Sequence, residues 1–127
     1  MKLNHMQHKH GGRIVSIDAI AHSVYKGAAE WHYVGAVEWS DGTASGHAEI
    51  APWALCYDHD NTQAHLEFRT LNILMGDYLS AQGEWHDPRS IRGGRIVHWT
   101  PKEKEHSLIV TPALWDSAVG QLEGQRP

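Results

Sequence analysis

The chain has 127 residues, with 11 Lys and Arg against 15 Asp and Glu, so its formal net charge is −4 when its 11 histidines are neutral. A chain of this length is typical of one domain. Its hydrophobic content of 41% excludes disordered and collagen-like classes, and no apolar run approaches the roughly 20 residues that span a membrane. Because the first ten residues lack the apolar stretch of a signal peptide, we expect a cytoplasmic protein.

The charge balance and the single cysteine exclude further classes. Nucleic-acid binding needs Lys and Arg against phosphates, and this acidic chain offers only Arg13 and a locally basic stretch with Arg89, Arg92 and Arg95. We therefore expect no nucleic-acid partner. Cys56 has no second thiol for a disulfide, a redox pair or a zinc knuckle, so we interpret it as a small buried hydrophobe.

Three segments follow from composition along the chain. Residues 1–10 are polar and show no periodicity, which predicts a flexible N-terminal arm, with metal binding by its histidines as the weaker interpretation. Residues 11–119 are predicted to form a single domain, and residues 120–127 a frayed C-terminus. Within the domain, Gly11-Gly12 precedes a stretch rich in β-branched residues that predicts a strand over 13–25, followed by a loop at 26–30.

Residues 31–52 are predicted to form a β-hairpin. The dipeptide Asp41-Gly42 favours a two-residue type I′ turn, which would place Trp39 opposite Ala44 and Tyr33 opposite Ile50. The two faces then separate by polarity. The predicted core face carries Tyr33, Val37, Trp39 and Ile50, and the predicted solvent face carries Glu38, Ser40, Thr43, Ser45, His47 and Glu49.

An apolar crossing at 51–57 and a turn at 58–61 precede a long helix, predicted over 61–82. Asp60 and Gln63 have the spacing of a capping box, and Gly83 suits the helix end. Apolar residues recur at three-or-four spacing, which predicts an amphipathic helix packed across a sheet. They are Ala64, Leu66, Phe68, Leu71, Ile73, Leu74, Met75, Tyr78 and Leu79.

The rest of the chain predicts a loop over 85–94, strands over 95–100 and 107–111, and a short helix over 113–119 that opens at Pro112. The pentapeptide Gly-Gly-Arg-Ile-Val occurs at 11–15 and again at 93–97. Because no other part of the two halves aligns, we interpret it as one loop-to-strand solution used twice and not as a repeat architecture.

The order β-β-β-α-β-β predicts an α+β domain with a mainly antiparallel sheet of about five strands, covered by one long helix. The segment Val34–Thr43 resembles the central hairpin of small SH3-like or Tudor-like barrels. That resemblance implies five short strands curled on themselves, although the small barrel has no counterpart of the long helix. An open sheet with the helix over one face has the same strand order, and both alternatives stay open at this point.

No strong catalytic motif is present: the chain has no phosphate loop, no nucleophile elbow, no H-E-x-x-H and no C-x-x-C. We therefore assign no catalytic residue and no cofactor, and lean against an enzyme. Asp58, His59, Asp60 and His65 could hold a metal ion at the helix start. Acids before a helix more often bind its free amides, so the metal interpretation is the weaker one.

Two other clusters combine acids with histidines. Glu38, His47 and Glu49 share the predicted solvent face of the hairpin, where charged residues usually serve solubility. The loop after the helix carries Glu84, Trp85, His86 and Asp87, and loops are where function concentrates.

Six tryptophans are either core residues or parts of a binding surface. They are Trp31, Trp39, Trp53, Trp85, Trp99 and Trp115. The hairpin register places Trp39 inward, Trp53 lies in the apolar crossing and Trp99 in a strand, so these predict core positions. Trp31 and Trp85 lie in or beside loops, and we expect them to be the exposed pair.

The leading hypothesis is a small binding or adaptor domain that acts through protein–protein contacts at Trp31 or the 84–87 loop, with a homodimer as a natural version. The alternative is a small-molecule-binding protein or small enzyme whose pocket lies between helix and sheet. It would use His47, His86 or His98 with a carboxylate as acid–base groups.

Overall fold

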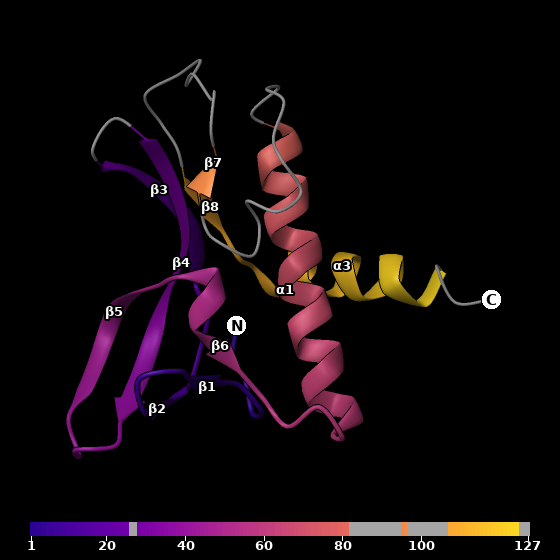
Figure 1. The fold of residues 1–127 in the computed structure, drawn as a ribbon. Helices are drawn as coiled ribbons and strands as arrows, with labels where there is room; N and C mark the ends of the chain where they lie inside the picture. Colours follow the sequence, from indigo (N-terminus) through magenta and orange to yellow (C-terminus); the bar gives the residue numbers. More distant parts are fainter. Residues whose placement is uncertain (26–27, 82–94, 97–106, 125–127) are drawn as a thin grey trace.

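The computed structural model describes residues 1–25, 28–81, 95–96 and 107–124. These residues form an antiparallel sheet with helices on one side of it (Figure 1). The elements are β1 (Gln7–His8), β2 (Gly12–Ile14), β3 (Ala19–Tyr25), β4 (Ala28–Trp39), β5 (Ala44–Ile50), the 3-10 helix η1 (Pro52–Ala54), β6 (Leu55–Cys56), α1 (Thr62–Ala81), β7 (Arg95–Ile96), β8 (Ser107–Ile109) and α3 (Pro112–Gly124).

The long strand β4 organises the sheet. Val34 pairs with Ala19 of β3 and with Glu49 of β5, and Glu38 pairs with Arg13 of β2 and with Ala44 of β5. Strands β2 and β3 therefore follow one edge of β4, and β5 follows the other. Strand β8 extends the sheet beyond β3, while β1 and β6 extend it beyond β2.

This arrangement confirms the α+β class and the antiparallel sheet. All pairings between the described strands are antiparallel. The path of paired strands runs from β6 to β8 without joining its two ends. The described strands thus form an open sheet, and the SH3-like closure that the hairpin suggested is wrong.

The long helix is confirmed almost residue for residue, since α1 covers Thr62–Ala81 against a prediction of 61–82. Its cap lies one residue later than predicted: Asn61 Oδ1 accepts the backbone N–H groups of Gln63 at 2.9 Å and Ala64 at 3.1 Å. The Asp58 carboxylate accepts the N–H of Asp60 at 2.9 Å and so forms the turn before the cap. Asn performs the same capping chemistry as Asp.

The core lies between the sheet and α1. It combines the inner face of β4 and β5, at Tyr33, Val37 and Ile50, with the apolar stripe of α1, at Leu71 and Met75. The Tyr33 hydroxyl donates a hydrogen bond to the Leu71 carbonyl oxygen at 3.0 Å and so joins the sheet to the helix. Burial raises the pKa of Tyr33 well above its usual value.

The two chain ends differ from their predictions. Residues 1–10 are packed: Leu3 and Met6 are fully buried in the core, and Gln7–His8 pairs with β2 and with β6. The Glu67 side chain of α1 accepts the N–H groups of Asn4 and His5, each at 3.1 Å. The prediction of a loose arm was wrong because two isolated apolar residues suffice to anchor a short segment between sheet and helix.

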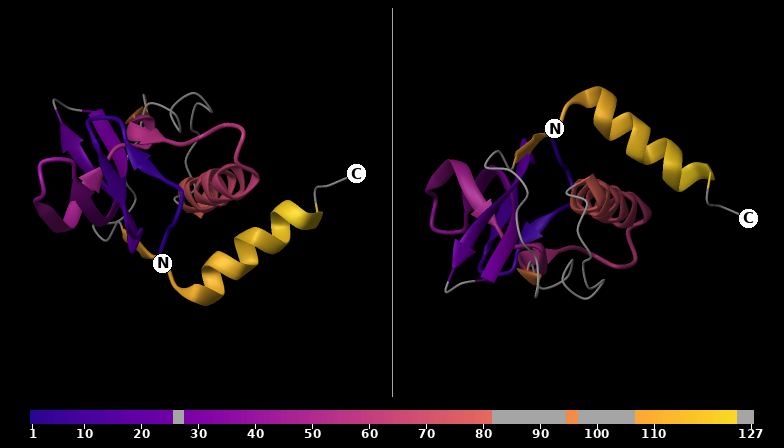
Figure 2. Two further views of the ribbon diagram at one scale, coloured as in Figure 1. Left: turned by 90° about the horizontal axis from the view of Figure 1, so that it is seen from below. Right: turned by 90° about the horizontal axis from the view of Figure 1, so that it is seen from above.

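The C-terminal helix is longer than predicted. It begins at Pro112 behind a Thr111 cap, whose hydroxyl accepts the N–H of Leu114 at 3.2 Å, and it continues to Gly124 instead of ending at 119. Trp115, Ala118 and Leu122 lie on its buried face. Figure 2 shows α3 running across α1 and away from the sheet. The burial of Leu122 overturns the prediction of fraying from residue 120 onward.

The hairpin turn also differs from the prediction. Trp39 donates its N–H to the Thr43 carbonyl at 2.8 Å, and Gly42, with φ of 91°, donates to the Trp39 carbonyl at 3.0 Å. The turn therefore has three residues with glycine in the left-handed region. A bulge beyond it restores the predicted pairs Gly35–Ala48 and Tyr33–Ile50.

The bulge changes which side chains share a face. Ser45 pairs with Val37 on the inner side, is half-buried, and accepts a hydrogen bond from Trp39 Nε1 at 3.1 Å. Trp39 itself is half-buried. The prediction that Ser45 faces solvent was wrong because a one-residue slip moves a strand residue to the other face.

Each copy of the repeated pentapeptide contains a strand that pairs with β4. The first copy begins β2, where Arg13 pairs with Glu38, and the second contains β7, where Arg95 pairs with Glu30. Both partners belong to β4, at opposite ends of the strand and on opposite edges. Gly93, Gly94 and Val97 lie outside the described residues, so the interpretation as one loop-to-strand solution used twice stays a prediction.

Candidate functional site

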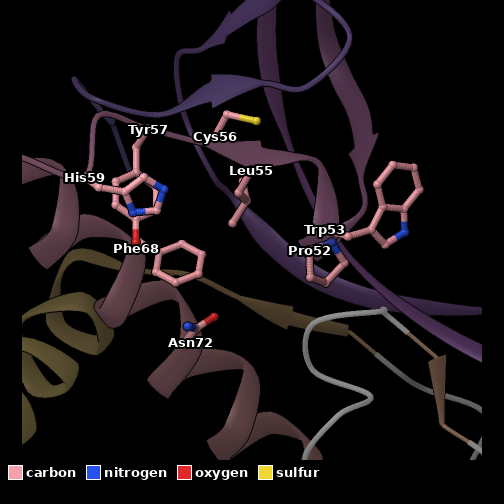
Figure 3. Close-up of a pocket in the computed structure, with 8 residues that line it drawn as sticks. All are labelled: Pro52, Trp53, Leu55, Cys56, Tyr57, His59, Phe68 and Asn72. Carbon is pink, nitrogen blue, oxygen red and sulfur yellow. The ribbon is translucent and has the colours of Figure 1, made fainter.

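A cavity of about 600 Å³ lies between α1 and the segment that crosses from η1 to β6. We call it the aromatic cavity. Figure 3 shows Phe68 and Asn72 of α1 on one side and Pro52 and Leu55 on the other. The described residues that line it are Pro52, Trp53, Leu55, Cys56, Tyr57, His59, Phe68 and Asn72.

One end of the aromatic cavity is a cluster of rings around Tyr57. The Tyr57 and Phe68 rings lie 4.8 Å apart with 31° between their planes, and the His59 ring lies 4.5 Å from Tyr57. His65 of α1 approaches Tyr57 edge-on at 5.8 Å. These contacts hold the ring faces in place before any ligand arrives.

The other end is formed by Pro52 and Trp53. The Trp53 side chain is 49% exposed although the crossing is apolar, which corrects the expectation that it is core. The turn after β1 supports its indole: the Lys9 ammonium lies 5.3 Å above the ring, and the His10 ring meets it edge-on at 6.1 Å. Pro52 begins η1 and turns the chain so that Trp53 projects outward.

Asn72 brings a polar group to the aromatic cavity from the mainly apolar buried face of α1. It is half-buried and lies one turn from Phe68 and from Met75 on the helix surface. No hydrogen bond joins its side-chain amide to another described residue. Among the described residues that line the cavity, none is Lys, Arg, Asp or Glu.

His8 lies beside this site and is structural. Its ring packs edge-on against Trp39 at 4.8 Å and lies 5.5 Å from the His10 ring. The backbone N–H of His10 donates to His8 Nδ1 at 3.1 Å, which requires that Nδ1 carries no proton. Partial burial, and next the neighbouring His10 charge, lower the pKa of His8.

The predicted metal candidates at the helix start do not converge on one point. The Asp58 carboxylate accepts a hydrogen bond from the backbone N–H of Asp60, while His59 and His65 pack against the Tyr57 ring from two directions. Across residues 1–25, 28–81, 95–96 and 107–124, no group of three or more His, Cys, Asp or Glu side chains could hold a metal ion.

The predicted cluster on the hairpin is also divided. Glu38 pairs with Arg13 at 3.8 Å, and the exposed Glu49 carboxylate lies 3.7 Å from Nε2 of the buried His32. His47 lies exposed in the bulge of β5. The three residues therefore serve different neighbours and form no acid–base pair.

The remaining predicted binding residues lie inside the core or outside the described residues. Trp31 is 2% exposed, so the expectation that it forms a contact surface was wrong. Strand alternation places it on the same face of β4 as Tyr33. Glu84, Trp85, His86, Asp87, His98, Trp99, Arg89 and Arg92 lie outside the described residues.

The sequence did not predict the aromatic cavity because most of its lining residues have the pattern of core residues. Pro52, Trp53, Leu55 and Tyr57 belong to the crossing that was interpreted as apolar filling. One signal was available: Asn72 interrupts the apolar stripe of α1 in the middle of its face. A polar residue at such a position is either paired within the core or borders a space.

No protein-family model, no curated protein and no solved structure matches this chain. In the part of the chain that the structure describes, no helix is both long enough and apolar enough to span a membrane. Function must therefore be argued from the geometry of the site itself.

Proposed function

We propose that this chain is a small-molecule-binding domain whose ligand occupies the aromatic cavity. The observation that carries the proposal is the cavity of about 600 Å³ with aromatic ends and Asn72 between them. Ligand sites usually have volumes of roughly 300–1,000 Å³, apolar walls and a few polar groups. The proposal develops the small-molecule-binding alternative from the sequence, with the cavity between α1 and the η1–β6 segment as the site.

Binding is favoured over catalysis by the composition of the lining. General acid–base chemistry needs a titratable pair within hydrogen-bond reach of the substrate. The described lining offers the Cys56 thiol, the Tyr57 phenol and the His59 imidazole but no carboxylate, and no hydrogen bond joins any two of these three side chains. Such a set supports recognition of a ligand.

The test uses N-phenyl-1-naphthylamine, an uncharged dye whose emission rises in apolar surroundings. The wild-type chain should bind it saturably. Asn72→Phe should weaken binding by at least about tenfold, because a new ring on α1 fills the space. The matched control is Gln63→Phe, which adds the same ring to an exposed position of the same helix.

Equal dye affinity in the wild type and in folded Asn72→Phe would contradict the proposal. Thermal unfolding of each variant shows whether it is folded. The same unfolding measurement should show a higher midpoint for the wild type in the presence of dye, because the dye binds the native state.

We propose a homodimer as a second candidate, on a separate observation. Ile109 of β8 is 64% exposed, and among the described strands β8 is paired with β3 alone. An exposed apolar residue on such a strand favours pairing with another copy of the chain. Light scattering tests this candidate: a dimer that Ile109→Lys converts to a monomer supports it, and a wild-type monomer at high concentration rejects it.

A further inference from the structure

The charge of the lining restricts which ligand the aromatic cavity can take. The described lining has no side chain that is permanently charged at neutral pH. An ionised ligand would lose water on entry without gaining a counter-charge, which is unfavourable. The composition therefore selects against ions of either sign.

Cations meet an additional obstacle at Trp53. Exposed indole faces usually attract cations, but the Lys9 ammonium already lies 5.3 Å from the centroid of this ring. A cationic ligand beside Trp53 would be repelled by that charge across a short distance. The surroundings of Trp53 therefore favour an uncharged ligand.

The rings at both ends favour a flat ligand. Tyr57 and Phe68 form a tilted pair of rings at one end, and Pro52 and the outward-pointing Trp53 border the other end (Figure 3). Aromatic groups gain most from offset stacking or edge contacts with other rings. A planar aromatic ligand uses these surfaces better than a flexible chain, which would lose more conformational freedom.

Asn72 supplies the polar contact. Its side-chain amide has donors and an acceptor, faces the cavity (Figure 3), and is not hydrogen-bonded to another described residue. A ligand group with its own donor and acceptor, such as a carboxamide, would pair with it directly.

We infer that the aromatic cavity binds an uncharged, planar aromatic molecule that carries one hydrogen-bonding group recognised by Asn72. This inference rests on the proposed function, because it concerns the same cavity. It goes further by naming the class of ligand and the residues, Trp53 with Lys9 and Asn72, that select it.

The experiment compares four indoles that share one ring: indole-3-acetamide, indole-3-acetate, tryptamine and 3-methylindole. They are respectively a neutral amide, an anion, a cation and a neutral compound without a polar group at neutral pH. Each competes with N-phenyl-1-naphthylamine for the full-length chain. The amide should bind at least about tenfold more tightly than the anion or the cation, and about fivefold more tightly than 3-methylindole.

Two variants assign the selectivity to residues. In Asn72→Leu the advantage of the amide over 3-methylindole should disappear, while 3-methylindole binds as before or more tightly. In Lys9→Gln tryptamine should gain about threefold relative to the amide, because the repelling charge is gone. The control is Lys2→Gln, which removes an exposed charge from a residue outside the lining.

The possible outcomes separate the two proposals. Tighter binding of the acetate or of tryptamine than of the amide overturns the inference and leaves the cavity as a ligand site. The same conclusion follows if the dye binds and none of the four indoles displaces it. If the dye itself does not bind, the proposed function fails and the inference fails with it.

Discussion

The interface between α1 and the sheet is closed in one part and open in another, although the two parts adjoin on the same helix. In the closed part, the Leu71 side chain is buried in the core between α1 and the sheet, and its backbone carbonyl accepts a hydrogen bond from the Tyr33 hydroxyl. In the open part, Phe68, one turn before Leu71, and Asn72, the residue after it, face the short segment of η1 and β6 across the aromatic cavity.

The difference comes from what lies opposite the helix. Strands β4 and β5 present large, fully buried side chains such as Tyr33 and Ile50. The crossing has few residues, and its largest side chain, Trp53, projects toward solvent. The apolar stripe of α1 is therefore fully covered only where the opposite element can fill the space, and elsewhere the helix borders a cavity.

The largest effect is expected inside the sheet that covers the closed part, where β4 approaches the backbone of a neighbouring segment closely. A Cβ added at Gly35 of β4 would lie 1.9 Å from the Ser16 carbonyl oxygen and 3.0 Å from the Ile17 Cα. Gly35→Ala should therefore lower the free energy of unfolding by at least about 3 kcal/mol, since backbone must move. Urea titration measures the change.

Gly46→Ala is the control for this prediction. Gly46 belongs to the same hairpin, and no heavy atom of the described residues lies within 4 Å of an added Cβ. Its free energy of unfolding should change by less than about 0.5 kcal/mol. Similar losses at both glycines would show that general hairpin propensity, and not the contact with Ser16, explains the result.

The second prediction compares truncation in the closed and open parts. Leu71 is fully buried, so Leu71→Ala should cost about 3 kcal/mol. Phe68 is half-buried beside the aromatic cavity, so Phe68→Ala should cost about 1–2 kcal/mol although the removed group is larger. Denaturant unfolding of both variants measures the two costs. A larger loss of unfolding free energy in Phe68→Ala than in Leu71→Ala would contradict the division into closed and open parts.

The third prediction concerns the hydrogen bond that joins helix and sheet. Tyr33→Phe removes the donor to the Leu71 carbonyl and should cost about 1 kcal/mol at neutral pH. Because burial raises the pKa of Tyr33, the folded state favours the protonated phenol. Its contribution is fully present below the unfolded pKa of about 10 and is lost as pH rises toward the higher folded value.

Unfolding measured between neutral and alkaline pH checks the sign of this dependence. The wild type should lose stability more steeply above about pH 10 than Tyr33→Phe does. Groups that titrate in both proteins cancel in the difference between the two curves. Parallel curves would mean that the Tyr33 hydroxyl is not buried in solution.

The sequence predicted the elements with strong local patterns. The spacing of Leu71, Met75 and Leu79 predicted α1, because a helix face repeats within a few residues. Asp41-Gly42 predicted the hairpin, but not its turn type, since the same dipeptide suits two-residue and three-residue turns. The bulge at Gly46 and His47 carries no comparable local pattern.

The candidate site was less predictable because it depends on long-range packing. Whether Trp31 or Trp53 is exposed is decided by what packs against each, not by its neighbours in sequence. Trp31 falls on the inner face of β4, whereas Trp53 follows Pro52 at the start of η1. A tryptophan in an apolar stretch therefore does not by itself reveal whether it faces the core.

The smallest effect on stability is expected at Asn72, and its sign matters more than its size. Leu has a higher helix propensity than Asn and would cover apolar surface of the cavity, so Asn72→Leu should raise the free energy of unfolding by about 0.5 kcal/mol. A residue that lowers the stability of the folded protein, as Asn does here relative to Leu, is typical of a binding site. If urea titration instead shows a loss above about 1 kcal/mol, the Asn72 amide supports the fold, and its role in recognition would have to be abandoned.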